Sequence, residues 1–122
     1  MTIFDKYFTL WDSALLDESA FNDLIGLFAE DVVVQASQGE VKGKDTLAFG
    51  IRETLKNYFS MKHVWNAKNT DNGLKATWAV VHELKTGEMH AAVGVDIIKL
   101  NEFGKIKYLE IRPEQNITKK IQ

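Results

Sequence analysis

The hydrophobic pattern of the chain changes its period near the middle. Over roughly the first sixty residues, apolar side chains recur every three or four positions, which is the spacing of one face of an α-helix. The second half contains long alternating runs separated by glycine-containing turns, a pattern typical of antiparallel β-strands. Helices followed by long strands predict an α+β domain in which the helices cover one face of a strongly bent sheet.

We expect three helices in the N-terminal half. The first spans about residues 2–16, and the second carries Phe28 on its apolar face. The third begins near Gly43 and buries Phe59 at its far end. A short β-branched strand is expected at residues 31–34, between the second and third helices.

The strands of the second half are predicted at residues 63–70, 74–84, 89–100 and 105–112. Pro113 is expected to end the last strand, because proline cannot donate to a sheet ladder. We therefore predict a folded domain over residues 1–113 and a polar C-terminal tail over 114–122.

One carboxylate interrupts the hydrophobic alternation of the 89–100 strand. Asp96 lies within Gly94-Val95-Asp96-Ile97-Ile98, where an ionised side chain would be costly. It requires a partner, a water-filled pocket or a raised pKa. Asp96 therefore indicates a small-molecule cavity, although a structural carboxylate bonded to its neighbours would give the same pattern.

The faces of these strands depend on the turn at Lys85-Thr86-Gly87-Glu88. A simple turn would pair Glu83 with His90 and Thr77 with Asp96, and would put His90 and Asp96 on one face. Glu83 and His90 would then be an acid–base pair or an ordinary surface pair. A bulge would exchange the two faces.

Composition restricts the classes of partner. With 122 residues, a net charge of −2 and mixed acidic and basic residues, the chain has no basic patch typical of nucleic-acid binding. It has no cysteine, and its three histidines lack metal-ligand spacing, so neither a metal nor another cofactor is expected. No signal peptide or membrane-spanning run is visible, and we expect a cytoplasmic protein with no membrane partner.

The order of these elements resembles the nuclear transport factor 2-like superfamily, and within it the SnoaL-like and ketosteroid-isomerase-like branch. The matching segments are Leu27-Phe28-Ala29-Glu30-Asp31-Val32, the Gly39/Gly43 pair, Gly94-Val95-Asp96 and Phe103-Gly104-Lys105-Ile106. The likeness covers residues 3–112. It implies a cone-shaped roll that holds a small apolar molecule and pairs as a homodimer through its sheet.

The resemblance also implies roles for single residues. Ketosteroid isomerase uses an Asp base together with a Tyr and a protonated Asp that donate to the enolate oxygen. Asp96 is similar in position to the protonated Asp. The base position falls near Ala36 and the tyrosine position near Trp11 or Asp12, with Tyr7 one turn earlier. The complete isomerase triad is therefore absent.

The candidate catalytic residues are Asp96, with His63 or His90 as the base. His63 would alternatively be a boundary residue between helix and strand. The candidate ligand contacts, which would otherwise be packing residues, are Trp11, Phe28, Ala36, Phe59 and Trp78. The predicted function is binding of a small molecule in an apolar pocket, with isomerisation, cyclisation or dehydration next to a carbonyl as the enzymatic outcome. The alternative is a non-catalytic ligand-binding or dimeric interaction module.

Overall fold

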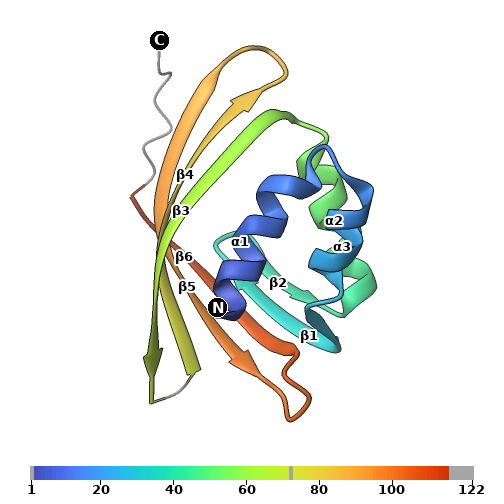
Figure 1. The fold of residues 1–122 in the computed structure, drawn as a ribbon, viewed down its shortest axis with the longest axis vertical. Helices are drawn as coiled ribbons and strands as arrows, with labels where there is room; N and C mark the ends of the chain where they lie inside the picture. Colours follow the sequence, from blue (N-terminus) through green and yellow to red (C-terminus); the bar gives the residue numbers. More distant parts are fainter. Residues whose placement is uncertain (1, 72, 116–122) are drawn as a thin grey trace.

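The computed structural model describes residues 2–71 and 73–115 (Figure 1). Within that part of the chain, three helices and six strands follow one another in the order α1 (Ile3–Ala14), α2 (Glu18–Ile25), β1 (Phe28–Ala36), β2 (Gly39–Lys42), α3 (Lys44–Leu55), β3 (Tyr58–Thr70), β4 (Gly73–Leu84), β5 (Met89–Leu100) and β6 (Ile106–Gln115).

The six strands form one open, curved sheet in the order β2-β1-β6-β5-β4-β3. All neighbouring pairs are antiparallel except β1 and β6, which run parallel. The three helices lie together on the concave side, and the β4–β5 hairpin extends beyond them (Figure 1). The predicted α+β fold, with helices on one face of a curved and mainly antiparallel sheet, is confirmed.

Local sequence explains how α1 is placed. Thr2 and Asp5 form a capping box, in which Asp5 N–H donates to the Thr2 hydroxyl and Thr2 N–H donates to the Asp5 carboxylate. The apolar stripe of α1 then buries Phe4 and Phe8 against the sheet. Burial of side chains of this size stabilises the fold by roughly 1.5–3 kcal/mol each.

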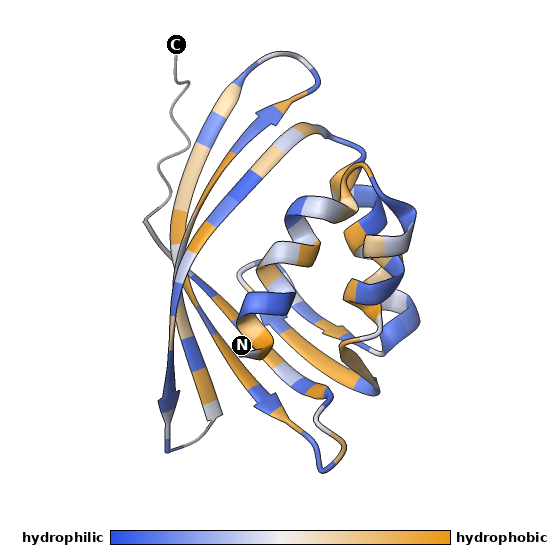
Figure 2. Cartoon of the chain, in the orientation of Figure 1, coloured by the Kyte–Doolittle hydropathy of each residue, from blue (hydrophilic) through white to orange (hydrophobic). Residues whose placement is uncertain are grey.

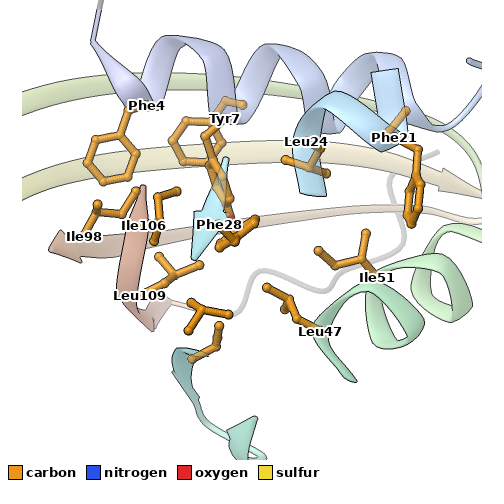
Figure 3. Packing of buried hydrophobic residues seen from close by; sticks show 14 of the residues in the cluster. Phe4, Tyr7, Phe21, Leu24, Phe28, Leu47, Ile51, Ile98, Ile106 and Leu109 are labelled. Carbon is orange, nitrogen blue, oxygen red and sulfur yellow. The ribbon is translucent and has the colours of Figure 1, made fainter. Parts of the chain in front are cut away.

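The largest fully buried side chains gather where α1 and α2 meet β1, β5 and β6 (Figure 3). Its fully buried side chains are Phe4, Phe8, Leu24, Phe28, Val32, Ile98, Ile106 and Leu109. Along the strands, polar and apolar residues alternate as expected for a sheet with one covered face (Figure 2). This core holds α1 against the sheet and fixes the floor and wall of the cavity described below.

Two predicted element boundaries are wrong. Helix α2 ends at Ile25, so Phe28 is the first residue of β1, where it pairs with Ile106 and stays buried. Helix α3 ends at Leu55, and β3 begins at Tyr58 rather than at His63. In both places pairing with a strand distant in sequence outweighs the local helical period.

Phe59 is consequently a strand residue. The pairing of β3 with β4 shifts between Tyr58 and Ser60, which marks a bulge at Phe59. The Phe59 side chain is 64% exposed instead of being buried under a helix.

The register of the β4–β5 hairpin is offset by one residue from the predicted simple turn. His82 lies opposite His90, and Ala76 opposite Asp96. The cause is Gly87, whose φ of +92° takes the left-handed position of a three-residue loop. His90 and Asp96 still share one face of β5, as alternation requires.

The last strand continues past Pro113. Strand β6 extends to Gln115, and its register against β5 shifts between Val93 and Gly94. That irregularity accommodates the proline, which sheets tolerate at bulges. The predicted end of the strand at Arg112 is therefore wrong by three residues, and residues 116–122 of the predicted tail lie outside the described residues.

Candidate functional site

A cavity of about 190 Å³ lies between α1, α3 and the concave face of the sheet. That volume is comparable with the ~150 Å³ apolar cavity that accepts benzene. Its walls are mainly apolar, with a few polar groups among them. The lining residues are Tyr7, Phe8, Trp11, Thr54, Tyr58, Met61, His63, Trp78, Val80, His82, Asp96 and Ile111.

Asp96 is the acid of this cavity. Its side chain is buried, with only 3% of the residue exposed, and one carboxyl oxygen accepts a 2.8 Å hydrogen bond from Trp78 Nε1–H. Burial raises the pKa of Asp96 from 3.8 to about 7, and the Trp78 hydrogen bond opposes that rise. Near pH 6 this carboxyl group is therefore mostly protonated and available as a donor.

Gly94 explains how Trp78 reaches Asp96. Gly94 lies directly opposite Trp78 in the β4–β5 pairing. A Cβ atom on Gly94 would lie 2.5 Å from Trp78 Cζ2 and 2.8 Å from the Arg112 carbonyl oxygen. Because glycine has no Cβ, the indole can lie close to the Gly94 backbone while its N–H donates to the Asp96 carboxyl group.

His63 is held by a carboxylate from a different element. Its Nδ1 lies 2.6 Å from Asp12 Oδ1, and its backbone N–H donates to Asp12 Oδ2 at 2.9 Å. Both side chains are largely buried. A carboxylate at Nδ1 selects the tautomer that carries its proton there, which leaves Nε2 as the acceptor. His63 also packs edge-on against Trp78, with ring centroids 6.4 Å apart, so Trp78 contacts both His63 and Asp96.

Tyr7 adds a second neutral oxygen to the same wall. Burial raises the pKa of the Tyr7 phenol above its usual value, the nearby Asp96 charge raises it further, and a hydrogen bond with Trp11 opposes both. Tyr7 therefore stays protonated across the physiological range. Its hydroxyl and the Asp96 carboxyl group are two potential donors in one apolar cavity.

A histidine pair lies toward the β4–β5 hairpin. The His82 ring stacks on His90 at 5.9 Å and meets Tyr58 edge-on at 4.6 Å. Burial lowers the pKa of His82, and His90 and His63 lower it further. His82 Nδ1 is buried without a hydrogen-bond partner among the described residues, while His90 Nε2 lies 3.3 Å from Glu88. His82 is therefore a neutral ring on the cavity wall.

The structure brings together four of the predicted site residues: Asp96, His63, Trp11 and Trp78 all line this cavity. Phe28 lines an adjoining cleft. Their roles remain predictions. The other three lie elsewhere: His90 is outside the cavity lining, Phe59 faces a separate groove beside Leu16, and Ala36 lines neither the cavity nor the cleft.

Four further residues belong to the site but are not among the predicted site residues: Asp12, Tyr7, Tyr58 and His82. Asp12 had a usable signal, since it follows Phe4 and Phe8 at four-residue intervals on the apolar stripe of α1. Such an acid on a buried stripe needs a partner, as Asp96 does on its strand. The identity of that partner, 51 positions away in β3, had no local signal.

Within residues 2–71 and 73–115, no three His, Asp or Glu side chains gather in a geometry that would hold a metal ion. None of the helices in that part of the chain has both the length and the apolar character needed to cross a membrane.

Comparisons with known proteins agree with this architecture. No family model and no curated protein matches the chain. Among solved structures, an "NTF2-like protein of unknown function" from Exiguobacterium sp. 255-15 is 31% identical, with a TM-score of 0.87 over 94% of this chain and 100% of its own.

Two further structures are similar in fold. A "putative polyketide cyclase" from Pseudomonas putida KT2440 is 15% identical, with a TM-score of 0.80 over 98% of this chain and 95% of its own. A "Putative Scytalone Dehydratase" from Novosphingobium aromaticivorans DSM 12444 is 15% identical, with a TM-score of 0.71 over 98% of this chain and 87% of its own. From its fold and its 31% identity to the Exiguobacterium protein, this chain belongs to the nuclear transport factor 2-like superfamily.

Proposed function

We propose that the protein is an enzyme of the SnoaL-like type that transfers a proton next to the carbonyl group of a small apolar substrate. The observation that carries the proposal is the content of one cavity. It holds a histidine oriented by a carboxylate at 2.6 Å and a buried carboxyl group that accepts a hydrogen bond from Trp78 and whose pKa is raised to about 7. Two titratable groups with opposite tasks in one apolar site are typical of acid–base catalysis.

Each group has a defined task. His63 Nε2 accepts the proton from the carbon next to the carbonyl, as the C–H electron pair forms the enolate. Asp12 keeps the imidazole in the required tautomer and stabilises the imidazolium that results. Protonated Asp96 and Tyr7 donate to the developing enolate oxygen.

The group that receives the proton from His63 then determines the reaction class. Its return to a different carbon completes an isomerisation. Its transfer to a hydroxyl group that leaves as water completes a dehydration. In an aldol-type cyclisation the enolate carbon attacks a second carbonyl, and the proton goes to the new alkoxide. Two structural neighbours, the "putative polyketide cyclase" and the "Putative Scytalone Dehydratase", are named for reactions within these classes, and this supports the proposal.

The direct test is exchange of the α-protons of cyclohexanone and 2-cyclohexenone for deuterium in D₂O, followed by proton NMR. We expect the protein to accelerate this exchange, and His63→Gln to abolish the acceleration. Asp12→Asn is expected to lower it by about 10²-fold or more, the scale of general-base catalysis. Asp23→Asn, which changes an exposed acid of α2, is the matched control and leaves the rate unchanged. Binding of these ketones without any acceleration would contradict the proposal.

The alternative function is a non-catalytic ligand-binding module. The observation favouring it is the Trp78 hydrogen bond, which already gives one Asp96 oxygen a partner inside the fold. In that case Asp96→Leu retains ligand affinity in a folded protein, and no α-proton exchange is seen with the unaltered protein.

Pairing of two copies through the convex face is a separate proposal. Val64 and Val81 alternate with the cavity-lining residues His63 and Val80, so their side chains lie on the side of the sheet away from the helices. They are 62% and 42% exposed, an apolar patch on adjacent strands. Sedimentation velocity should show a dimer that becomes monomeric in the Val64→Asp/Val81→Asp variant. If the unaltered protein sediments as a monomer, the proposed dimer is contradicted.

A further inference from the structure

A second cleft adjoins the cavity of Asp96. Its volume is about 280 Å³, and it shares four lining residues with the cavity: Tyr7, Trp11, Thr54 and Ile111. It lies on the side of these shared residues toward β1, β2 and α3. Its remaining lining residues are Phe28, Val34, Val41, Thr46, Leu47, Gly50, Ile51 and Leu109.

The two spaces differ in chemistry. The cavity holds the titratable groups Asp96, His63 and His82. Among the described residues, none that lines the cleft titrates near neutral pH, and the polar groups there are the Tyr7 hydroxyl, the Trp11 indole N–H and two threonine hydroxyls. A ligand that occupies both spaces would therefore present a polar end to Asp96 and an apolar end to the cleft.

Gly50 lies at the centre of the α3 face that lines the cleft. Thr46, Gly50 and Thr54 follow one another at four-residue intervals, and Leu47 and Ile51 complete the same face. Glycine in the interior of a helix lowers helix stability relative to alanine. The backbone conformation at this position does not require glycine, because the φ angle of Gly50 is not positive. A Cβ atom there would meet nothing within 4 Å. Gly50 is itself exposed and lines the cleft, so a side chain there would occupy open space at the edge of the cleft.

We propose that this cleft is the subsite for the apolar arm of the ligand, and that Gly50 keeps it open. The ligand class is then an amphiphilic carbonyl compound, with a ring-sized polar head in the cavity and an alkyl or second-ring arm in the cleft. The placement of the head rests on the function proposed above. The arm is argued from the four lining residues that the two spaces share and from the lack, among the described lining residues, of groups that titrate near neutral pH around the second.

Phenol and 4-butylphenol are suitable probes, because a phenol carries an enol-like oxygen and does not react. Binding is followed by quenching of tryptophan fluorescence, to which Trp11 at the shared wall contributes. Each buried methylene strengthens binding by about fourfold. We expect 4-butylphenol to bind at least about tenfold more tightly than phenol. Gly50→Leu is expected to cancel that gain while phenol affinity stays within about twofold.

Two further variants serve as controls for Gly50→Leu. Glu53→Leu places the same side chain on an exposed position of α3 and should keep the full butyl gain. Gly50→Ala adds one methyl group, favours the helix and should remove only part of the gain, so the subsite is testable even if Gly50→Leu folds poorly.

Several outcomes overturn the subsite: no binding of 4-butylphenol, no gain over phenol, or a gain that survives Gly50→Leu. Self-association that Gly50→Leu abolishes, with no butyl gain, would assign the cleft to a second copy of the chain and would also overturn it. A butyl gain without α-proton exchange keeps the subsite and refutes the proposed enzyme. α-Proton exchange without a gain in affinity from the butyl group supports the proposed enzyme and refutes the subsite.

Discussion

Replacing Asp96 with asparagine should remove a large pH-dependent penalty from the stability of the protein. Asparagine has nearly the shape of a protonated aspartate, and its side-chain oxygen still accepts the Trp78 N–H. It cannot ionise. The variant therefore isolates the free energy of charging this one buried group.

The magnitude follows from the pKa of Asp96, which is about 7 in the folded protein against an ordinary value of 3.8. Between these values the folded state holds a proton that the unfolded state has lost. Stability therefore falls as pH rises through this window. A tenfold change in acidity corresponds to about 1.4 kcal/mol, so the full penalty above pH 7 is about 4 kcal/mol. This penalty is a large part of the free energy of unfolding of a typical domain, which is roughly 5–15 kcal/mol.

The assay is urea unfolding, followed by tryptophan fluorescence from below the lower pKa to above the higher one. We expect the unaltered protein and Asp96→Asn to be similarly stable at the acid end. Above pH 7 the variant should be more stable by about 4 kcal/mol. Taking the difference between the two proteins cancels the titration of other groups, and Asp23→Asn should behave like the unaltered protein. A difference that stays constant with pH, or that grows toward acid, would refute the argument from burial.

Three further predictions follow from the same contacts. Trp78→Phe removes the hydrogen bond that favours the ionised form, so carbon-13 NMR titration should find the pKa of Asp96 above its value of about 7. Gly94→Ala forces a Cβ against Trp78 and the Arg112 carbonyl oxygen, and urea unfolding should show a loss of about 1–3 kcal/mol. Burial holds the pKa of His82 below 6.5, so the unfolded chain takes up its proton first on acidification. His82→Gln should therefore weaken the loss of stability below pH 6.5, measured by thermal unfolding across acidic buffers.

Some of these features are visible along the chain and others are not. The capping of α1, its apolar stripe and the alternation of the long strands are local, so they predict the fold class well. Asp96 was identifiable for the same reason, since a single carboxylate in an apolar alternation contradicts its surroundings. Phe28 and Phe59 were misplaced because an apolar residue at an element boundary fits a helix or a strand equally well.

The alternating pattern of residues 74–84 and 89–100 determines that two amphipathic strands exist, and the helical spacing near the N-terminus determines what covers them. Their register was decided by the three-residue loop at Gly87, which moved the pairing by one position. The partnership of Asp12 with His63, and the cleft left open beside Gly50, arise only when distant elements pack together. Sequence pattern records which side of an element is apolar. Which side chains then meet depends on long-range register and helix placement, and these are set by the packing of the whole core.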